Sequence, residues 1–216
     1  MTTEVTLHFK DTNSSIGVTA HQTQTGIKRN FRISPEILPS IFGNSWRTGY
    51  FAVSQDGPIF LENRGDKTLV VVQRALRREQ NVRWGTSDLV LTTPWTVFIF
   101  AFAPNADSDY TLHSSQIYTT TGPALGGFTR LCPAQWLGNV YADHRVCWGS
   151  TAVGDGGTVS LASATNFVND FFYQPFNSDL ARSPNLWKEF TETERLPRAS
   201  IGSLDSIIER FWSENH

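Results

Sequence analysis

The segment Thr96–Phe102 constrains the fold of this chain more than any other part of the sequence. Its residues, Thr-Val-Phe-Ile-Phe-Ala-Phe, are almost all β-branched or aromatic. Successive side chains of a strand point to opposite faces of a sheet, so a strand that is apolar on both faces must be covered on both. We therefore predict a central strand here, buried on two sides and stopped by Pro104.

Shorter strand candidates precede this segment. Tyr50–Val53, Ile59–Glu62 and Leu69–Gln73 are separated by turn-rich tetrapeptides, a pattern that predicts an antiparallel meander. Apolar and polar residues also alternate over 5–9 and again over 16–18, which predicts an N-terminal β-hairpin. Residues 110–157 lack regular periodicity and are rich in Gly, Ser, Thr and Pro, which predicts a long irregular segment of the kind that often carries function.

Helical spacing of apolar residues begins only after this segment. One helix is predicted from Leu161 to Phe172, with Ser160 as its N-cap and Pro175 ending it. Two more are predicted over Leu186–Thr191 and Leu204–Trp212, the second capped by Ser203. Strands first and helices last predict an α+β fold, with helices segregated from an antiparallel sheet.

Composition excludes several classes of function. Fifteen Phe and seven Trp with 18% charged residues exclude disorder for the bulk of the chain. A formal charge of −2 lacks the cationic excess that binding to nucleic acid requires. The longest apolar stretch is about half of the ~20 residues that a membrane-spanning helix needs, and the N-terminus does not resemble a signal peptide. We expect a soluble, cytoplasmic protein with two free cysteines, although one disulfide between them is sterically conceivable.

Cys147 is the strongest candidate for a reactive residue. It lies in the segment Asn139–Ser150, just before a glycine-rich stretch and the first predicted helix. Reactivity requires the thiolate, which Arg145 and His144 would favour electrostatically if their side chains turn inward. The alternative is a small buried hydrophobic residue beside Trp148.

Other clusters rank lower. A zinc site would have only His144, Cys147 and Cys132 as nearby donors, without the paired spacings of structural zinc sites. A cysteine-hydrolase dyad of His144 and Cys147 is disfavoured, because residues three apart on a strand tend toward opposite faces. A small basic cluster consists of Arg74, Arg77 and Arg78. It either binds an acidic partner or is a charged surface exposed to solvent.

The spacing around Cys147 resembles that of the ubiquitin-conjugating enzymes. In that family the Asn of a His-Pro-Asn tripeptide precedes the catalytic cysteine by eight residues, as Asn139 precedes Cys147 here. The approach to the cysteine, Asn-Val-Tyr and then Arg-Val-Cys, is also similar. The His and Pro of the tripeptide are replaced by Leu137 and Gly138.

More narrowly, the chain is similar to the prokaryotic family D of these proteins, the PRTRC system protein B type. The resemblance rests on Asn139–Tyr141, on Val146–Ser150 and on the aromatic segment Phe171–Phe176. It covers roughly Trp95 to Asp179. The fold that it implies is α+β and ubiquitin-conjugating-enzyme-like, an antiparallel β-meander with helices packed on one side. An N-terminal β-rich extension of residues 1–45 would precede a core of residues 46–190 and a C-terminal helix within residues 191–216.

The resemblance also implies roles for single residues. Cys147 would carry a ubiquitin-like modifier as a thioester. The amide of Asn139 would donate to the tetrahedral oxyanion, or would only stabilise its loop. Asp179, at about the matching offset from Cys147, would orient or deprotonate the incoming lysine, with Asp155 as a second candidate.

The implied partners are a small β-grasp modifier, a ThiF-type activating enzyme and a JAMM-type metalloprotease, and neither a metal nor an organic cofactor is expected. The alternatives are a catalytically inactive adaptor of the same fold and a structural or assembly component of a mobile genetic element.

Overall fold

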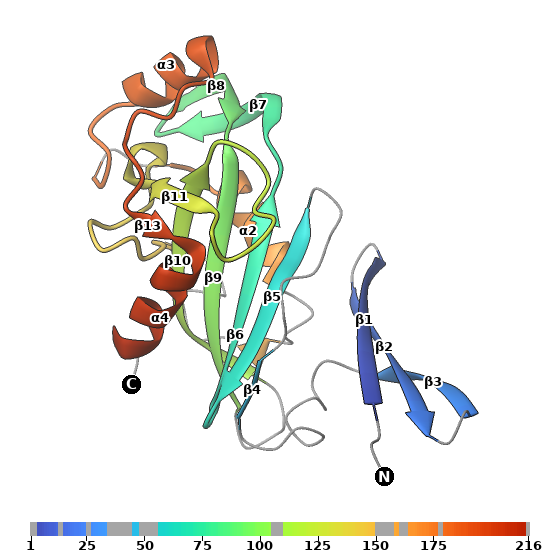
Figure 1. Ribbon diagram of the computed structural model, residues 1–216. Helices are drawn as coiled ribbons and strands as arrows, with labels where there is room; N and C mark the ends of the chain where they lie inside the picture. The colour runs from blue at the N-terminus through green and yellow to red at the C-terminus, as the bar shows by residue number, and fades with distance from the viewer. Residues whose placement is uncertain are drawn as a thin grey trace.

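The computed structural model describes residues 4–12, 15–24, 27–33, 45–47, 56–104, 110–149, 158–159, 164–176 and 179–214 of the chain. Side chains are described for residues 56–103, 111–149, 164–176 and 179–214. These residues form an α+β structure with a curled antiparallel sheet and three α-helices (Figure 1). The predicted α+β class is confirmed.

The main sheet has eight strands, all paired antiparallel. Seven follow in spatial order, and the eighth, β12, pairs with β10. In that spatial order the strands are β13 (Gly202–Ser203), β11 (Arg130–Pro133), β10 (Tyr110–Thr120), β9 (Trp95–Pro104), β6 (Lys67–Arg74), β5 (Gly57–Arg64) and β4 (Ser45–Arg47), with β12 at Thr158–Val159.

The strand β9 lies between β6 and β10, as predicted for Thr96–Phe102. Phe98, Phe100 and Phe102 pack into one hydrophobic layer, and Val97, Ile99 and Ala101 pack into another on the opposite face. All six side chains are fully buried. The strand ends at Pro104, where the sequence predicted it to stop.

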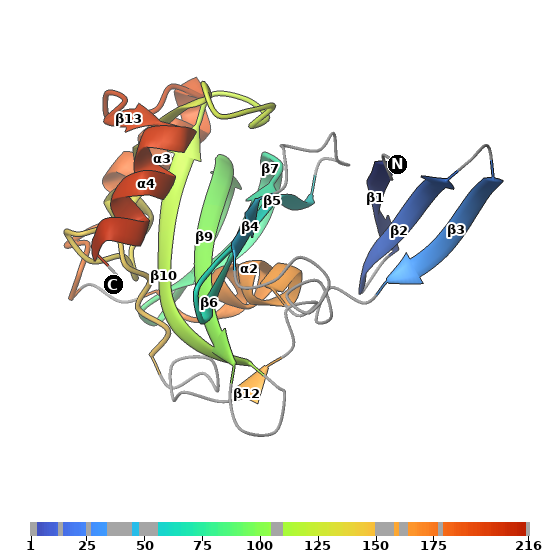
Figure 2. The same cartoon turned by 60° about the horizontal axis from the view of Figure 1, so that its bottom comes forward.

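Helices cover both faces of the sheet. The helix α2 (Ala164–Tyr173) and the helix α3 (Asn185–Thr193) contribute to the layer that contains Phe100, while α4 (Leu204–Glu214) contributes to the layer that contains Ile99. Figure 2 shows α2 and α4 on opposite sides of β9 and β10. The prediction that the helices pack on one side is therefore wrong, because the second apolar face of β9 also requires cover.

The helix predictions otherwise hold over the described residues. Pro175 follows α2 closely, and α3 and α4 extend the predicted ranges by one to two residues at their ends. The hydroxyl oxygen of Ser203 accepts a hydrogen bond from the backbone N–H of Ser206 at 3.3 Å, which confirms Ser203 as the cap of α4. The predicted cap of α2, Ser160, lies outside the described residues.

A separate hairpin closes one end of the α2 layer. It consists of β7 (Arg77–Trp84) and β8 (Ser87–Thr93), which pair with each other. The indole N–H of Trp187 donates to the carbonyl of Thr92 at 2.8 Å and so joins α3 to this hairpin. The ring of Trp84 stacks on Phe176, which follows α2.

The N-terminal strands form their own antiparallel sheet of β1 (Glu4–Thr12), β2 (Ser15–Gln24) and β3 (Ile27–Ile33). Thr12 pairs with Ser15, which confirms the predicted hairpin. The strand candidate Tyr50–Val53 lies outside the described residues, whereas Ile59–Glu62 and Leu69–Gln73 fall within the paired strands β5 and β6.

The predicted irregular segment 110–157 is only partly irregular. Its first eleven residues form β10, which pairs with β9 over the full length of the strand. Within the described part of the chain no helix is long and apolar enough to cross a membrane.

Candidate functional site

Residues 139–147 form a tight hairpin on the edge of β10, and we call this segment the cysteine hairpin. Val140 bridges Val146, and the backbone N–H of Tyr141 donates to the carbonyl of Arg145 at 2.9 Å. The backbone N–H of Val146 donates to the carbonyl of Ser115 in β10 at 3.1 Å. The segment is therefore a short, firmly hydrogen-bonded addition to the main sheet.

A one-turn 3-10 helix, η2 (Gln135–Leu137), leads into the hairpin through Gly138. Gly138 has φ of 80°, and a Cβ placed there would lie 3.0 Å from the ring of Trp84. Proline fixes φ near −65°, so it would not fit this backbone. The local conformation at Gly138 thus favours glycine and excludes proline, and the residue before it, Leu137, is fully buried in the core.

Cys147 ends the hairpin as a half-buried free thiol. Its backbone N–H donates to the carbonyl of Asn139 at 2.8 Å, which brings two of the predicted site residues together. The side-chain amide of Gln174 donates to the carbonyl of Cys147 at 3.4 Å. Cys132, in β11, is also free, and burial raises the pKa of its thiol. Both cysteines are thus free thiols in the structure.

The hydroxyl of Tyr141 faces the thiol, with its oxygen 3.5 Å from the Sγ of Cys147. The hydrogen bond to Cys147 raises the pKa of Tyr141, and so the phenol remains a proton donor at neutral pH. The side chain is 40% exposed, and the guanidinium of Arg145 lies 5.7 Å from the centre of its ring.

Sequence reasoning gave Tyr141 no role. Pairing within the hairpin could have identified it. Val140 and Val146 are cross-strand partners, so Tyr141 and Cys147, which each follow one of them, are diagonal neighbours across the two strands.

The side chain of Asn139 is bound to the chain that follows α2. The residue is 3% exposed and its backbone φ is 51°. Its Nδ2 donates a hydrogen bond to the carbonyl of Pro175 at 2.9 Å. This bond ties the cysteine hairpin to the chain that follows α2. The contact favours the loop-stabilising alternative, and a role in binding the oxyanion stays a prediction.

The side chain of His144 contacts Gln135 and Tyr118. Its Nδ1 is 2.9 Å from the amide nitrogen of Gln135, and its ring centre is 4.8 Å from that of Tyr118. Burial and then the charge of Arg210 lower the pKa of His144. The described contacts of His144 are thus with groups other than Cys147, and His144 lies in the turn of the hairpin with φ of 71°, whereas the sequence-based expectation placed it on a strand. Among the described residues no group of three or more His, Cys, Asp or Glu could hold a metal ion.

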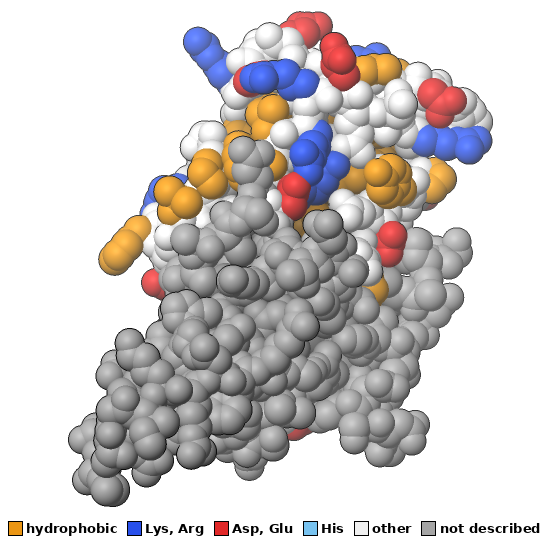
Figure 3. All heavy atoms as spheres, turned by 90° about the vertical axis from the view of Figure 1, so that its right-hand side faces the viewer, with side chains coloured by type: hydrophobic (Ala, Val, Ile, Leu, Met, Phe, Trp, Pro, Cys, Tyr) orange, Lys and Arg blue, Asp and Glu red, His pale blue; other side chains and the backbone are white. Residues whose placement is uncertain are grey.

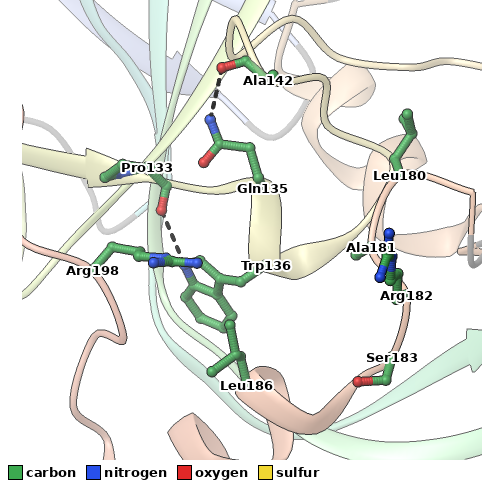
Figure 4. A pocket seen from close by; sticks show the side chains of 10 residues that line it. All are labelled: Pro133, Gln135, Trp136, Ala142, Leu180, Ala181, Arg182, Ser183, Leu186 and Arg198. Carbon is green, nitrogen blue, oxygen red and sulfur yellow. Dashed lines mark hydrogen bonds between the residues drawn. The ribbon is translucent and has the colours of Figure 1, made fainter.

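Asp179 lies exposed in the turn after α2, at the start of a loop that lines a pocket of about 610 Å³. Figure 4 shows this pocket between Gln135 and Ala142 on one side and Leu180 to Ser183 on the other. Trp136 and Leu186 form an apolar wall, and the side chains of Arg182 and Arg198 add positive charge. The pocket thus lies between the cysteine hairpin, at Ala142, and the turn that contains Asp179. The second candidate acid, Asp155, lies outside the described residues.

The arrangement supplies a nucleophile and a neighbouring hydrogen-bond donor. A half-buried thiol on a rigid hairpin can form a covalent acyl intermediate, and a phenol 3.5 Å away can donate to an oxygen that develops next to the sulfur. Comparison of the chain with models of known families, with curated proteins and with solved structures found no match.

Proposed function

We propose that this protein carries a ubiquitin-like modifier as a thioester on Cys147, in a prokaryotic conjugation system. The observation that carries the proposal is the contact of the Tyr141 hydroxyl with the sulfur of a half-buried, free Cys147. A cysteine with a purely structural role has no need of a protonated phenol at its sulfur.

The order of elements supports a ubiquitin-conjugating-like fold. Four antiparallel strands of the main sheet, β5, β6, β9 and β10, follow in chain order and are neighbours in space. A 3-10 turn, the cysteine hairpin and a helix on one face of that sheet come after them. This sequence of parts is the one that the resemblance implies.

The transfer would proceed in two acyl steps. The Cys147 thiolate attacks the thioester carbonyl of a modifier held on an activating enzyme, and the tetrahedral adduct collapses by expelling that enzyme's thiolate. An amine then attacks the new thioester, the Cys147 thiolate leaves, and the amine loses a proton. Both adducts place a negative oxygen beside the sulfur, within reach of the Tyr141 hydroxyl.

The other proposed roles are local. Asn139 holds the hairpin against the carbonyl of Pro175 and so positions Cys147. Asp179, exposed on its turn, would orient or deprotonate the incoming amine. The activating enzyme would be of the ThiF type, the modifier a β-grasp protein, and a JAMM-type metalloprotease would belong to the same system.

The test is the intact mass of the full chain after incubation with ATP, a ThiF-type activating enzyme and a β-grasp modifier from the same operon. We expect an adduct that requires ATP and disappears with thiol reductant. Cys147→Ser should convert it to an ester that resists reductant or abolish it, whereas Cys132→Ser should leave it unchanged.

A second variant separates an active carrier from an inactive adaptor. Tyr141 is partly exposed, so Tyr141→Phe should fold normally and yet slow thioester formation by about tenfold or more, since one oxyanion donor is worth about 10²–10³ in a comparable site. If the activating enzyme is charged and Cys147 forms no adduct, the carrier proposal fails and the adaptor reading replaces it.

A further inference from the structure

A second pocket, none of whose lining residues belongs to the cysteine hairpin, lies at the corner where β6, β7 and the C-terminal part of α2 meet. It has a volume of about 440 Å³ and is lined by the basic cluster Arg74, Arg77 and Arg78, together with polar residues. None of its lining residues is acidic. Figure 3 views the side of the molecule on which β5 and β7 lie, where basic, acidic and hydrophobic side chains are interspersed.

Arg74 is the unusual member of this cluster, because only 7% of the residue is exposed. Its guanidinium donates to the hydroxyl of Thr93 at 2.8 Å and to the side-chain oxygen of Gln80, and it lies 4.1 Å from the ring centre of Phe172. All three partners are uncharged. Burial, and then the neighbouring Arg77, lower the pKa of Arg74 to about 10.

The other two arginines have acidic partners at the rim. Arg77 pairs with Asp56, and Arg78 pairs with Glu194 at 2.7 Å. All four of these side chains are substantially exposed, and exposed ion pairs cost little to open. Among the described residues Arg74 forms its hydrogen bonds with neutral groups, and Asp56, which pairs with Arg77, also raises the pKa of Arg74 at longer range, so three arginines share the two carboxylates Asp56 and Glu194. Burying a cation in this way is expensive unless an anion compensates it.

The donors approach the pocket from three elements. Arg74 belongs to β6, Arg77 and Arg78 to β7, and Asn169 and Tyr173 to α2. A carboxylate offers two oxygens in one plane, whereas a tetrahedral phosphate offers three or four that can meet donors from several directions. Guanidinium groups bind phosphate oxygens in pairs and in a fixed geometry.

We propose that this pocket binds the phosphate group of a small phosphorylated molecule, with Arg74 as the buried counter-charge and Arg77 and Arg78 closing over the anion. The site is independent of Cys147 and goes beyond the thioester chemistry proposed above. A volume of about 440 Å³ suits a ligand of roughly nucleotide size.

Isothermal titration calorimetry of the full chain tests the proposal, with pyrophosphate as the probe and succinate as the carboxylate probe, both at constant ionic strength. We expect pyrophosphate to bind and succinate to bind at least about tenfold more weakly, since the donors suit a tetrahedral anion. Cys147→Ser should bind pyrophosphate as the unaltered chain does, so this result does not depend on the thioester proposal.

Variants locate the binding. Arg77→Gln and Arg78→Gln change exposed side chains and should each weaken pyrophosphate by about tenfold, the value of a charge-assisted pair of hydrogen bonds. Arg83→Gln is the matched control, because Arg83 is an exposed arginine of the same strand that does not line the pocket. Circular dichroism checks that each variant is folded.

Three results would overturn the proposal: no heat of binding with pyrophosphate, equal affinity for succinate, or an equal loss in Arg83→Gln. Equal affinity for succinate would indicate a carboxylate site instead, and an equal loss in the control would indicate non-specific attraction to surface charge.

Discussion

Replacement of Asn139 separates its structural contribution from a role in the chemistry. Its side chain makes a 2.9 Å hydrogen bond to the carbonyl of Pro175, and its backbone has φ of 51°. The net worth of such a bond is about 1 kcal/mol. A left-handed backbone costs about 1 kcal/mol more for alanine than for asparagine or glycine.

The two variants should therefore differ. Asn139→Ala loses both contributions and should lower the free energy of unfolding by about 2 kcal/mol, whereas Asn139→Gly keeps the backbone freedom and should lose about half of that. Urea unfolding followed by tryptophan fluorescence measures both values, since the chain contains seven Trp.

Thioester formation by the folded Asn139→Gly variant completes the test. If Asn139 only positions the hairpin, the rate should stay within about tenfold of that of the unaltered chain, whereas a lost oxyanion donor costs about 10²–10³. The structural reasoning is refuted if both variants keep full stability and lose thioester formation together.

Three further predictions concern stability. The indole N–H of Trp212 donates at 2.8 Å to the buried carboxylate of Glu62, so Trp212→Phe should cost about 1.5–3 kcal/mol in urea unfolding, and no loss would show that this bond is not formed. A Cβ on Gly127 would overlap the carboxylate of Asp205, which would have to turn aside, so Gly127→Ala should cost about 1 kcal/mol, and less when combined with Asp205→Ala. Strictly additive effects in that double-mutant cycle would argue against the clash. Burial lowers the pKa of His144 below its ordinary value of 6.5, so below that pH the unfolded chain takes up a proton that the folded chain does not. The free energy of unfolding should therefore fall from pH 7 toward pH 5, and His144→Asn, which tolerates the φ of 71°, should flatten this slope; an unchanged slope would contradict the shift.

The parts of the fold that the sequence predicts are those whose pattern is set by burial. Thr96–Phe102 is apolar on both faces and became the central strand, and Leu204–Trp212 is apolar on one face and became α4. The sequence could not predict which face of the sheet α4 covers. The apolar side of an amphipathic helix indicates that the helix packs on an apolar surface, but both faces of this sheet are apolar.

Two strands, β10 and β7, escaped prediction for another reason. The strand β10 carries Ser115 and Gln116, which look like loop residues but are buried under the cysteine hairpin, where Ser115 accepts a hydrogen bond from the indole of Trp148 at 2.9 Å. The first half of β7 is exposed and polar, including Arg77 and Arg78, so it shows no alternation. Tertiary contacts override local pattern in both strands.

The candidate site was predictable in part. The spacing of Asn139 and Cys147 indicated that the two belong together, and their backbones share a hydrogen bond. The direction of each side chain depends on the positive φ values of Asn139 and His144, which local sequence does not reveal. Tyr141 meets the sulfur only because of that turn.

The double burial of β9 also determines how the molecule opens. Its phenylalanines belong to one hydrophobic layer and its aliphatic residues to the other, so neither layer can separate from the sheet without exposing this strand. Both layers therefore unfold as one cooperative unit. The amide protons of β9 should be the last to exchange with deuterated solvent, at a rate set by global unfolding, whereas those of the exposed half of β7 exchange through local fluctuations.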